Sequence, residues 1–187
     1  RFTYRGSTSQ PSMTDLLDIT DDSNPLNVKK GNPGLKPSFT QNFRLFYNNY
    51  IQNHQRSIMA HLMFSTTDNS ISNMVTYDKT TGGQTTRPEN INGNWNAFGM
   101  FMFNTAIDTA AYFNVNTFTT VNYSNSVGYV SVDRADSQKS TTRTMNLGER
   151  IAASYRNDWF ELELNGSLSY MHARSKLQAN NNLDTWT

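Results

Sequence analysis

Apolar and polar residues alternate along most of the chain with a period of two. The alternation is clearest between Trp159 and His172. One parity there carries Phe160, Leu162, Leu164, Leu168 and Tyr170, and the other carries Glu161, Glu163, Asn165, Ser167 and Ser169. Successive side chains of a β-strand point to opposite faces, so this pattern predicts a strand with one apolar and one polar face.

The same alternation predicts six full strands and a partial strand at each end of the chain. The full strands lie at 38–50, 56–79, 84–107, 113–131, 141–156 and 159–176. Helical periodicity is confined to the stretch from Pro11 to Thr20, which predicts one or two helical turns. The expected fold class is all-β and antiparallel, with one short helical turn in a long loop.

Turn residues predict the register of three hairpins. A two-residue turn at Asn157-Asp158, a turn at Thr81-Gly82 and a connection at Ile51–His54 each bring apolar residues opposite apolar residues. The expected pairs include Tyr155–Phe160, Ala153–Leu162, Ile151–Leu164, Phe64–Gly99, Leu62–Phe101, Tyr47–Ile58 and Leu45–Ala60. Glu149, opposite Gly166, is the exception. A slip of one residue would oppose apolar to polar positions, so the pattern fixes which face each residue occupies.

Connection lengths and aromatic residues favour a membrane β-barrel. Short links near 51–55, 108–112 and 157–158 alternate with the 31-residue stretch Ser7–Pro37, the loop 133–140 and the loop 178–183. The turn at Thr81-Gly82, on the long-loop side, is short but joins long strands. Short turns on one rim and long loops on the other are typical of outer-membrane barrels. Aromatic residues gather at the short-turn rim, as in an interfacial belt: Tyr47, Tyr50, Tyr112, Phe113, Tyr155, Trp159 and Phe160.

A water-soluble β-sandwich explains the alternation equally well. It explains less well strands of 16–24 residues, since soluble strands usually have about 3–10. It also gives no reason for aromatic residues to gather at one set of turns. The barrel is therefore favoured, and the sandwich stays as an alternative.

Composition excludes several other classes. The 187 residues hold 16 Lys and Arg against 15 Asp and Glu, so charge alone does not suit nucleic-acid binding. The absence of Cys excludes a disulfide framework and a thiolate metal site within the chain. The chain lacks an initiator Met and a signal peptide, and we expect it to be a segment of a longer protein.

Residues 31–37 read Gly-Asn-Pro-Gly-Leu-Lys-Pro, with Asn42 five residues on, and resemble the G-N-P-x-L-K-P…N segment of TonB-dependent outer-membrane receptors, in particular those of Bacteroidetes-type bacteria. In that family the segment leads from a long extracellular loop into a descending strand, and three further motifs resemble the same family. Residues 10–12 resemble the Q-P-S that opens the helical turn of that loop, and residues 24–26 the N-P-L before the G-N-P element. Residues 86–93 resemble the R-P-x-N-x-x-G stretch of a descending strand. The sharp motifs cover about thirty residues, and glycine and proline give the first a structural role as a stiff turn.

The resemblance implies a single outer-membrane barrel domain spanning residues 1–187 as a partial wall, with its plug domain outside this chain. A full barrel would have about 22 strands, would sit in the outer membrane of a Gram-negative cell and would import a nutrient such as a metal chelate, a cofactor or a glycan. The implied partners are outer-membrane lipid, the plug and the TonB complex. A non-transport barrel that serves a surface complex, with a surface lipoprotein as partner, and a secreted adhesin or carbohydrate-binding module remain alternatives.

Residues that could carry chemistry are scattered, so we expect no enzyme activity, cofactor or metal site, and the substrate site stays unknown. His54, His61 and His172 lie far apart, and Asp15, Asp18, Asp21 and Asp22 lack the spacing of a calcium loop. Glu161 and Glu163 with Arg150 predict a charge ladder on the polar face. Met59, Met63, Met100 and Met102 fall on that same polar parity, where packing against a plug is one explanation.

Overall fold

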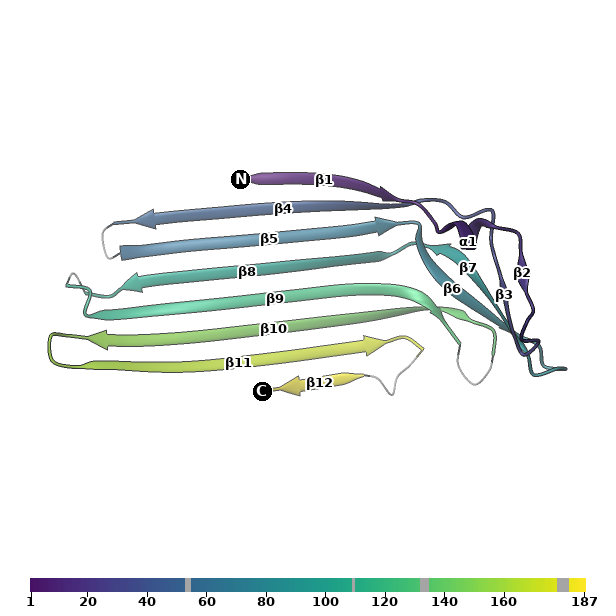
Figure 1. The fold of residues 1–187 in the computed structure, drawn as a ribbon. Helices are drawn as coiled ribbons and strands as arrows, with labels where there is room; N and C mark the ends of the chain where they lie inside the picture. Colours follow the sequence, from purple (N-terminus) through teal and green to yellow (C-terminus); the bar gives the residue numbers. More distant parts are fainter. Residues whose placement is uncertain (53–54, 109, 132–134, 178–181) are drawn as a thin grey trace.

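The computed structural model of the protein describes residues 1–52, 55–108, 110–131, 135–177 and 182–187. Eight strands form one antiparallel sheet in the order β1-β4-β5-β8-β9-β10-β11-β12 (Figure 1). Their bounds are β1 Phe2–Ser9, β4 Ser38–Ile51, β5 Arg56–Asp68, β8 Asn94–Ala106, β9 Phe113–Val130, β10 Gln138–Arg156, β11 Glu161–Ser175 and β12 Leu183–Trp186. The all-β fold class and the partial strand at each end are confirmed. The sheet is open, with β1 and β12 at its two edges.

The assignment of residues to the two faces is confirmed, but all three predicted registers are wrong by two residues. Tyr155 pairs with Leu162 instead of Phe160, Leu62 with Gly99 instead of Phe101, and Leu45 with Leu62 instead of Ala60. At β10–β11 the cause is turn length, whereas the β4–β5 connection keeps its expected four residues but lies one position later, since Ile51 pairs with Arg56. The β10–β11 connection has four residues, 157–160, closed by the Asn157 N–H, which donates to the Phe160 carbonyl at 2.9 Å. A shift of two moves partners along the strand and leaves every side chain on its predicted face.

The strands expected at 56–79 and 84–107 each break in two. Backbone φ turns positive at Asn69 (53°) and Gly93 (116°), where β5 gives way to β6 (Ser70–Tyr77) and β7 (Gln84–Ile91) gives way to β8. Pairing keeps the same offset through the break, because Thr67 pairs with Asn94 and Ser70 pairs with Ile91. The hairpin is therefore continuous but bent, and its outer half leaves the main sheet. The turn at its tip is also longer than Thr81-Gly82, since it spans residues 78–83.

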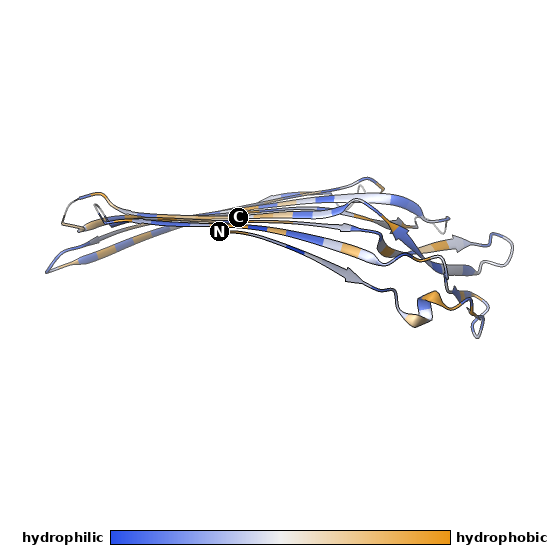
Figure 2. Cartoon of the chain, turned by 90° about the horizontal axis from the view of Figure 1, so that it is seen from above, coloured by the Kyte–Doolittle hydropathy of each residue, from blue (hydrophilic) through white to orange (hydrophobic). Residues whose placement is uncertain are grey.

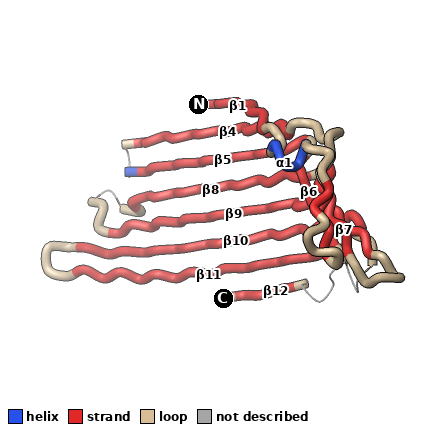
Figure 3. Tube along the Cα trace, turned by 45° about the vertical axis from the view of Figure 1, so that its right-hand side comes forward, coloured by secondary structure: helices blue, strands red, loops and turns tan. Residues whose placement is uncertain are grey.

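The bent half, with β6 and β7, joins a second sheet of four strands at the long-loop end of the molecule (Figure 3). Its order is β2-β3-β7-β6, with β2 at Thr20–Asp21 and β3 at Asn27–Lys30 (Figure 1). The one helical turn expected near Pro11 is α1 (Met13–Leu16), which Ser12 caps by accepting from the Asp15 N–H at 3.1 Å. The connection between β1 and β4 thus runs over residues 10–37, slightly shorter than expected, and carries α1, β2 and β3.

Little of the main sheet is buried, because no second layer covers its apolar face in the described part of the chain. Leu162, Leu164 and Leu168 are 45%, 63% and 49% exposed. The few buried apolar side chains are Leu35, Ile91, Ala106 and Val127. A water-soluble sandwich would bury those leucines against another sheet, so the sandwich alternative is wrong. No helix among the described residues has the length and apolar character to cross a membrane.

Candidate functional site

The two faces of the main sheet differ in chemistry along its whole width. We call the apolar face the side that carries Leu45, Leu62, Val121, Leu147 and Leu168, and the polar face the opposite side. Hydropathy alternates along each strand when the sheet is seen edge-on (Figure 2). Every leucine of β4 to β11 lies on the apolar face. An exposed apolar face of this extent requires contact with something other than water.

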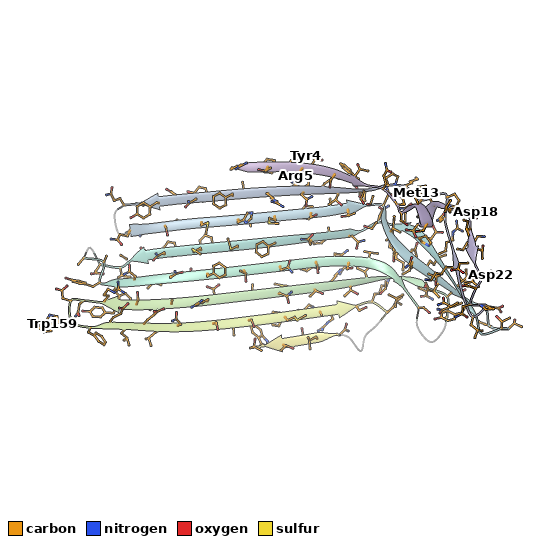
Figure 4. The ribbon with its side chains drawn as sticks, viewed as in Figure 1. Tyr4, Arg5, Met13, Asp18, Asp22 and Trp159 are labelled. Atoms are coloured by element: carbon orange, nitrogen blue, oxygen red, sulfur yellow. The ribbon has the colours of Figure 1, made fainter. Side chains whose placement is uncertain are left out.

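Aromatic rings bound the apolar face at both ends. The expected belt at the short-turn end is present, with Tyr47 49% and Trp159 95% exposed (Figure 4), and the rings of Tyr155 and Phe160 lie 6.2 Å apart. Tyr50, although exposed, belongs to the polar face. The short-turn belt had been read from sequence, whereas a second row had not.

This second row crosses five neighbouring strands toward the long-loop end. Its rings run Tyr4–Phe43–Phe64–Trp95–Tyr123, with centroid distances of 5.0, 6.2, 5.8 and 5.1 Å. On β9, Phe113 and Tyr123 are separated by about ten residues, or about 33 Å of strand. A strand tilt of about 40° reduces this to about 25 Å, the height of the lipid-facing band of outer-membrane barrels. The row was missed because it depends on the register across five strands, which the sequence did not fix.

Glu149 is the charged exception near the middle of the apolar band. It pairs with Leu168, not with Gly166 as expected, and with Thr119 on the other side. The Thr119 hydroxyl donates to the Glu149 carboxylate at 2.5 Å. This hydrogen bond gives the carboxylate a polar partner on a mostly apolar face.

The polar face carries the predicted charged residues, but in different pairs. Arg156 bridges Glu161 at 2.6 Å, whereas Glu163 accepts from the Asn165 amide at 2.9 Å. Arg150 pairs along the sheet with Ser167 and not with either glutamate. Arg150, Glu163 and Asn165 nevertheless line one hollow of about 390 Å³ with Met102 and Phe118. The polar face therefore combines charged, amide and sulfur-bearing groups in one concavity.

Two of the motifs recognised in the sequence come together into one hydrogen-bonded unit, the Asn32 lock. Asn32 is only 5% exposed. Its side-chain amide donates to the Pro88 carbonyl at 2.9 Å, and its oxygen accepts from Arg87 Nη2 at 2.9 Å and from the Gly34 N–H at 3.0 Å. The residues 31–37 and 86–93 thus meet through a buried amide whose nitrogen and oxygen both have hydrogen-bond partners.

The lock extends to both sides of Asn32. The Asn90 oxygen accepts from the Lys36 N–H at 2.7 Å, and the Asn90 amide donates to the Lys36 carbonyl at 3.0 Å. Gly31 lies so close to the loop that a Cβ there would meet the Leu17 carbonyl oxygen at 1.8 Å. These contacts tie the loop that carries α1 to the bent hairpin, so the motif has the structural role that its glycines and prolines predict.

The remaining candidate ligands do not assemble a metal site of the usual kind. No group of three His, Cys, Asp or Glu side chains suitable for a metal ion occurs among the residues the structure describes. Asp15 binds the Ser12 hydroxyl and Asp21 the Ser23 hydroxyl, whereas Asp18 and Asp22 lie along the exposed loop (Figure 4). His54 lies outside the described residues.

His172 has a partner that sequence spacing did not reveal. Its Nδ1 lies 2.5 Å from Asp184 Oδ1, and Arg174 forms a salt bridge with the other oxygen of the same carboxylate. Tyr170 donates to Asp184 Oδ1 at 3.1 Å. Asp184 comes from β12, which was predicted only as a partial strand, so its register against β11 had no sequence signal. Tyr170, His172 and Arg174 all contact the Asp184 carboxylate, and these three residues of β11 have the parity of the apolar face, toward its long-loop end.

Aspartates organise connections at both ends of the sheet. The carboxylate of Asp108 accepts from the N–H groups of Phe113 at 2.8 Å and Tyr112 at 3.0 Å. These bonds, chiefly the one from Phe113, hold the pKa of Asp108 below its ordinary value. Hydrogen bonds from Thr80 and Thr81 lower the pKa of Asp78 in the same way. Both carboxylates therefore act as turn-forming acceptors.

Comparison with known proteins agrees with this arrangement of faces. The model of the outer membrane protein beta-barrel family matches residues 1–186. No curated protein and no solved structure gave a significant match. With an uncovered apolar face, aromatic rows at both ends and a family match along almost its whole length, this chain belongs to the outer membrane protein β-barrel family and is located in the outer membrane.

Proposed function

We propose that the chain is part of the wall of a TonB-dependent outer-membrane transporter that takes up a nutrient, such as a metal chelate, a cofactor or a glycan. The Asn32 lock is the observation that carries the proposal. It joins residues 31–37, the more specific of the motifs that resemble TonB-dependent receptors, to residues 86–93, another of them. In that family the first stretch enters a descending strand from an extracellular loop, and here it enters β4 from the long-loop end.

The shape of the sheet supports a wide barrel with an enclosed interior. Eight strands suffice to close a small barrel, whereas the eight strands here remain open between β1 and β12. Their polar face carries charged and amide side chains suited to a hydrated interior or to contact with a plug. A barrel of about 22 strands with its own plug would accommodate this wall, and the TonB complex would be its inner-membrane partner.

Uptake assays on the full-length protein test the proposal. Deleting its gene is expected to abolish uptake of one radiolabelled nutrient from a panel of iron chelates, cobalamin and oligosaccharides. Plasmid-borne wild-type protein should restore that uptake in the deletion strain but not in a strain that also lacks TonB. Uptake that persists without TonB, or a deletion strain that takes up every member of the panel normally, would refute TonB-dependent transport.

A non-transport barrel within a surface complex is a second candidate, favoured by apolar side chains at the long-loop end. Met13, Ile19 and Leu26 are 75%, 60% and 61% exposed on the loop that carries α1. Such side chains would suit a protein partner, for example a surface lipoprotein. Replacing all three with serine should then abolish co-purification of that partner while the strains keep normal nutrient uptake. Loss of uptake without loss of any partner would favour the transporter instead.

A further inference from the structure

Methionines on the polar face gather on two neighbouring strands. Of the eight methionines in the chain, Met59 and Met63 lie on β5, and Met100 and Met102 lie on β8. Met59 pairs directly with Met102, and His61 pairs directly with Met100. These two pairs, Met59–Met102 and His61–Met100, lie next to each other and form a compact block of four side chains on one face of the sheet.

The apolar side chains are divided by type between the two faces. Every leucine and isoleucine of β4, β5 and β8 to β11 lies on the apolar face, whereas five of the six methionines in these strands lie on the polar face. If the polar face needed only bulk for packing, leucine would fill it at least as well. The polar face takes Phe46, Phe98 and Phe118 beside its methionines but no leucine or isoleucine. Four of its five methionines lie on β5 and β8, and this concentration of sulfur on two strands points to a use of the thioether group.

The block has the dimensions of a metal-binding site. Cβ atoms of directly opposed residues lie about 4.5–5.5 Å apart, and alternate residues along one strand lie about 6.6 Å apart. Methionine has three rotatable bonds beyond Cα, so its sulfur can move toward the centre of such a block. All four side chains are half-buried on this face, and the His61 ring packs edge-on against Phe46, with centroids 6.1 Å apart.

The donor set selects one class of ion. Thioether sulfur favours Cu(I), and imidazole also binds copper, whereas Mg²⁺ and Ca²⁺ require oxygen ligands. Carboxylates of the polar face, Glu161 and Glu163, stand on β11, three strands away from β8, which corresponds to about 14 Å. Glu163 lines the same hollow as Met102, but its carboxylate accepts from the Asn165 amide. The block itself offers a soft monovalent ion three sulfurs and a nitrogen.

We propose that Met59, His61, Met100 and Met102 form a Cu(I)-binding site on the polar face of the wall. The sequence-based expectation of no metal site considered histidine and carboxylate ligands, and the face-specific use of methionine lay outside that test. This site does not depend on TonB-driven uptake, because it requires only that the polar face be reached by the ion. Met63 lies next to His61 on β5 and is a reserve ligand at the edge of the block.

Competition titration tests the proposal on the full-length protein in detergent under anaerobic, reducing conditions. Cu(I) is partitioned between the protein and the chromogenic chelator bicinchoninate, and X-ray absorption reports the ligand atoms. We expect one equivalent of Cu(I) per protein with a sulfur-rich shell. The double variant Met59→Leu/Met102→Leu should weaken binding by at least about 100-fold and reduce the sulfur shell, since leucine keeps the volume and removes the donor.

Two controls make the outcome decisive. Met145→Leu changes the methionine that pairs with Tyr123 on the apolar face, so it should leave Cu(I) affinity unchanged. The heat-modified migration of each variant on a gel reports whether the barrel is folded. The proposal is overturned if folded wild-type protein retains less than one equivalent against bicinchoninate, if the double variant binds as tightly as wild type, or if Met145→Leu weakens binding equally.

Discussion

Removal of the Asn32 side chain should release the loop that carries α1 from the bent hairpin. In Asn32→Ala, three hydrogen bonds are lost, to the Pro88 carbonyl, the Gly34 N–H and the Arg87 guanidinium. Each contributes about 0.5–1.5 kcal/mol net, and the buried Pro88 carbonyl is left without its partner. The total is about 2–4 kcal/mol in the free energy of local opening.

Native-state hydrogen exchange measures this opening directly. A loss of about 2–4 kcal/mol should accelerate exchange over residues 27–37 by about 30-fold to 1,000-fold, while β9 and β10 exchange as in wild type. Asn32→Asp should fall between alanine and wild type, because its oxygens keep the Arg87 and Gly34 contacts but cannot donate to Pro88.

Asn48→Ala provides the matched control, since Asn48 is an exposed amide on β4 and should leave the exchange pattern unchanged. Unchanged exchange over residues 27–37 in Asn32→Ala would show that the lock does not hold the loop. Equal acceleration in Asn48→Ala would show that the effect is not specific to Asn32. Acceleration across the whole sheet would show that the opening is not confined to the loop.

Three further changes test other parts of the molecule. Gly31→Ala should displace the loop that carries α1 and make it more sensitive to limited proteolysis, because the added Cβ would meet the Leu17 carbonyl oxygen. Gly166→Ala is the control, since nothing lies within 4 Å of its added Cβ. Equal cleavage of the two variants would contradict the close contact between Gly31 and Leu17. Leu168→Arg should cost about 2–4 kcal/mol of folding free energy in lipid vesicles and Ser167→Arg much less, as judged by the heat-modified fraction on gels; the reverse order would invert the two faces. Because the pKa of Asp108 is lowered in the folded protein, its stabilisation is present above the ordinary value of 3.8 and is lost as pH falls through the lower folded pKa. A carboxyl-carbon NMR titration should find that midpoint below 3.8, and a midpoint at or above 3.8 would remove the proposed turn role.

Face assignment could be read from the sequence because it needs only the parity of each residue. Leu162 and Leu164 lie on the apolar face whether the β10–β11 turn has two residues or four. The register could not be read, because it depends on how Asn157 closes its turn through its own side chain, which accepts from Trp159 and Phe160. Polar turn residues of this kind permit several turn lengths with the same parity.

Contacts between segments far apart in the sequence could not be predicted for a related reason. The two motifs around Asn32 and Arg87 could each be recognised, but their contact follows from the bend at Asn69 and Gly93, which brings β7 beside β3. An asparagine with positive φ carries no signal that separates it from other asparagines of a chain rich in them. The sequence did show, in contrast, that the four methionines of β5 and β8 share the polar face. Only their pairing across the two strands could not be predicted.

The bend at Asn69 and Gly93 separates two parts of one hairpin that can change independently during evolution. On one side of the bend, β5 pairs with β8 within the main sheet, and on the other side β6 pairs with β7 within the second sheet. Insertions or deletions in the tip at residues 78–83 would lengthen or shorten only the outer half, at small entropic expense. Relatives of this protein can therefore diversify what they present to the surroundings of the cell while the membrane-embedded strands keep their alignment.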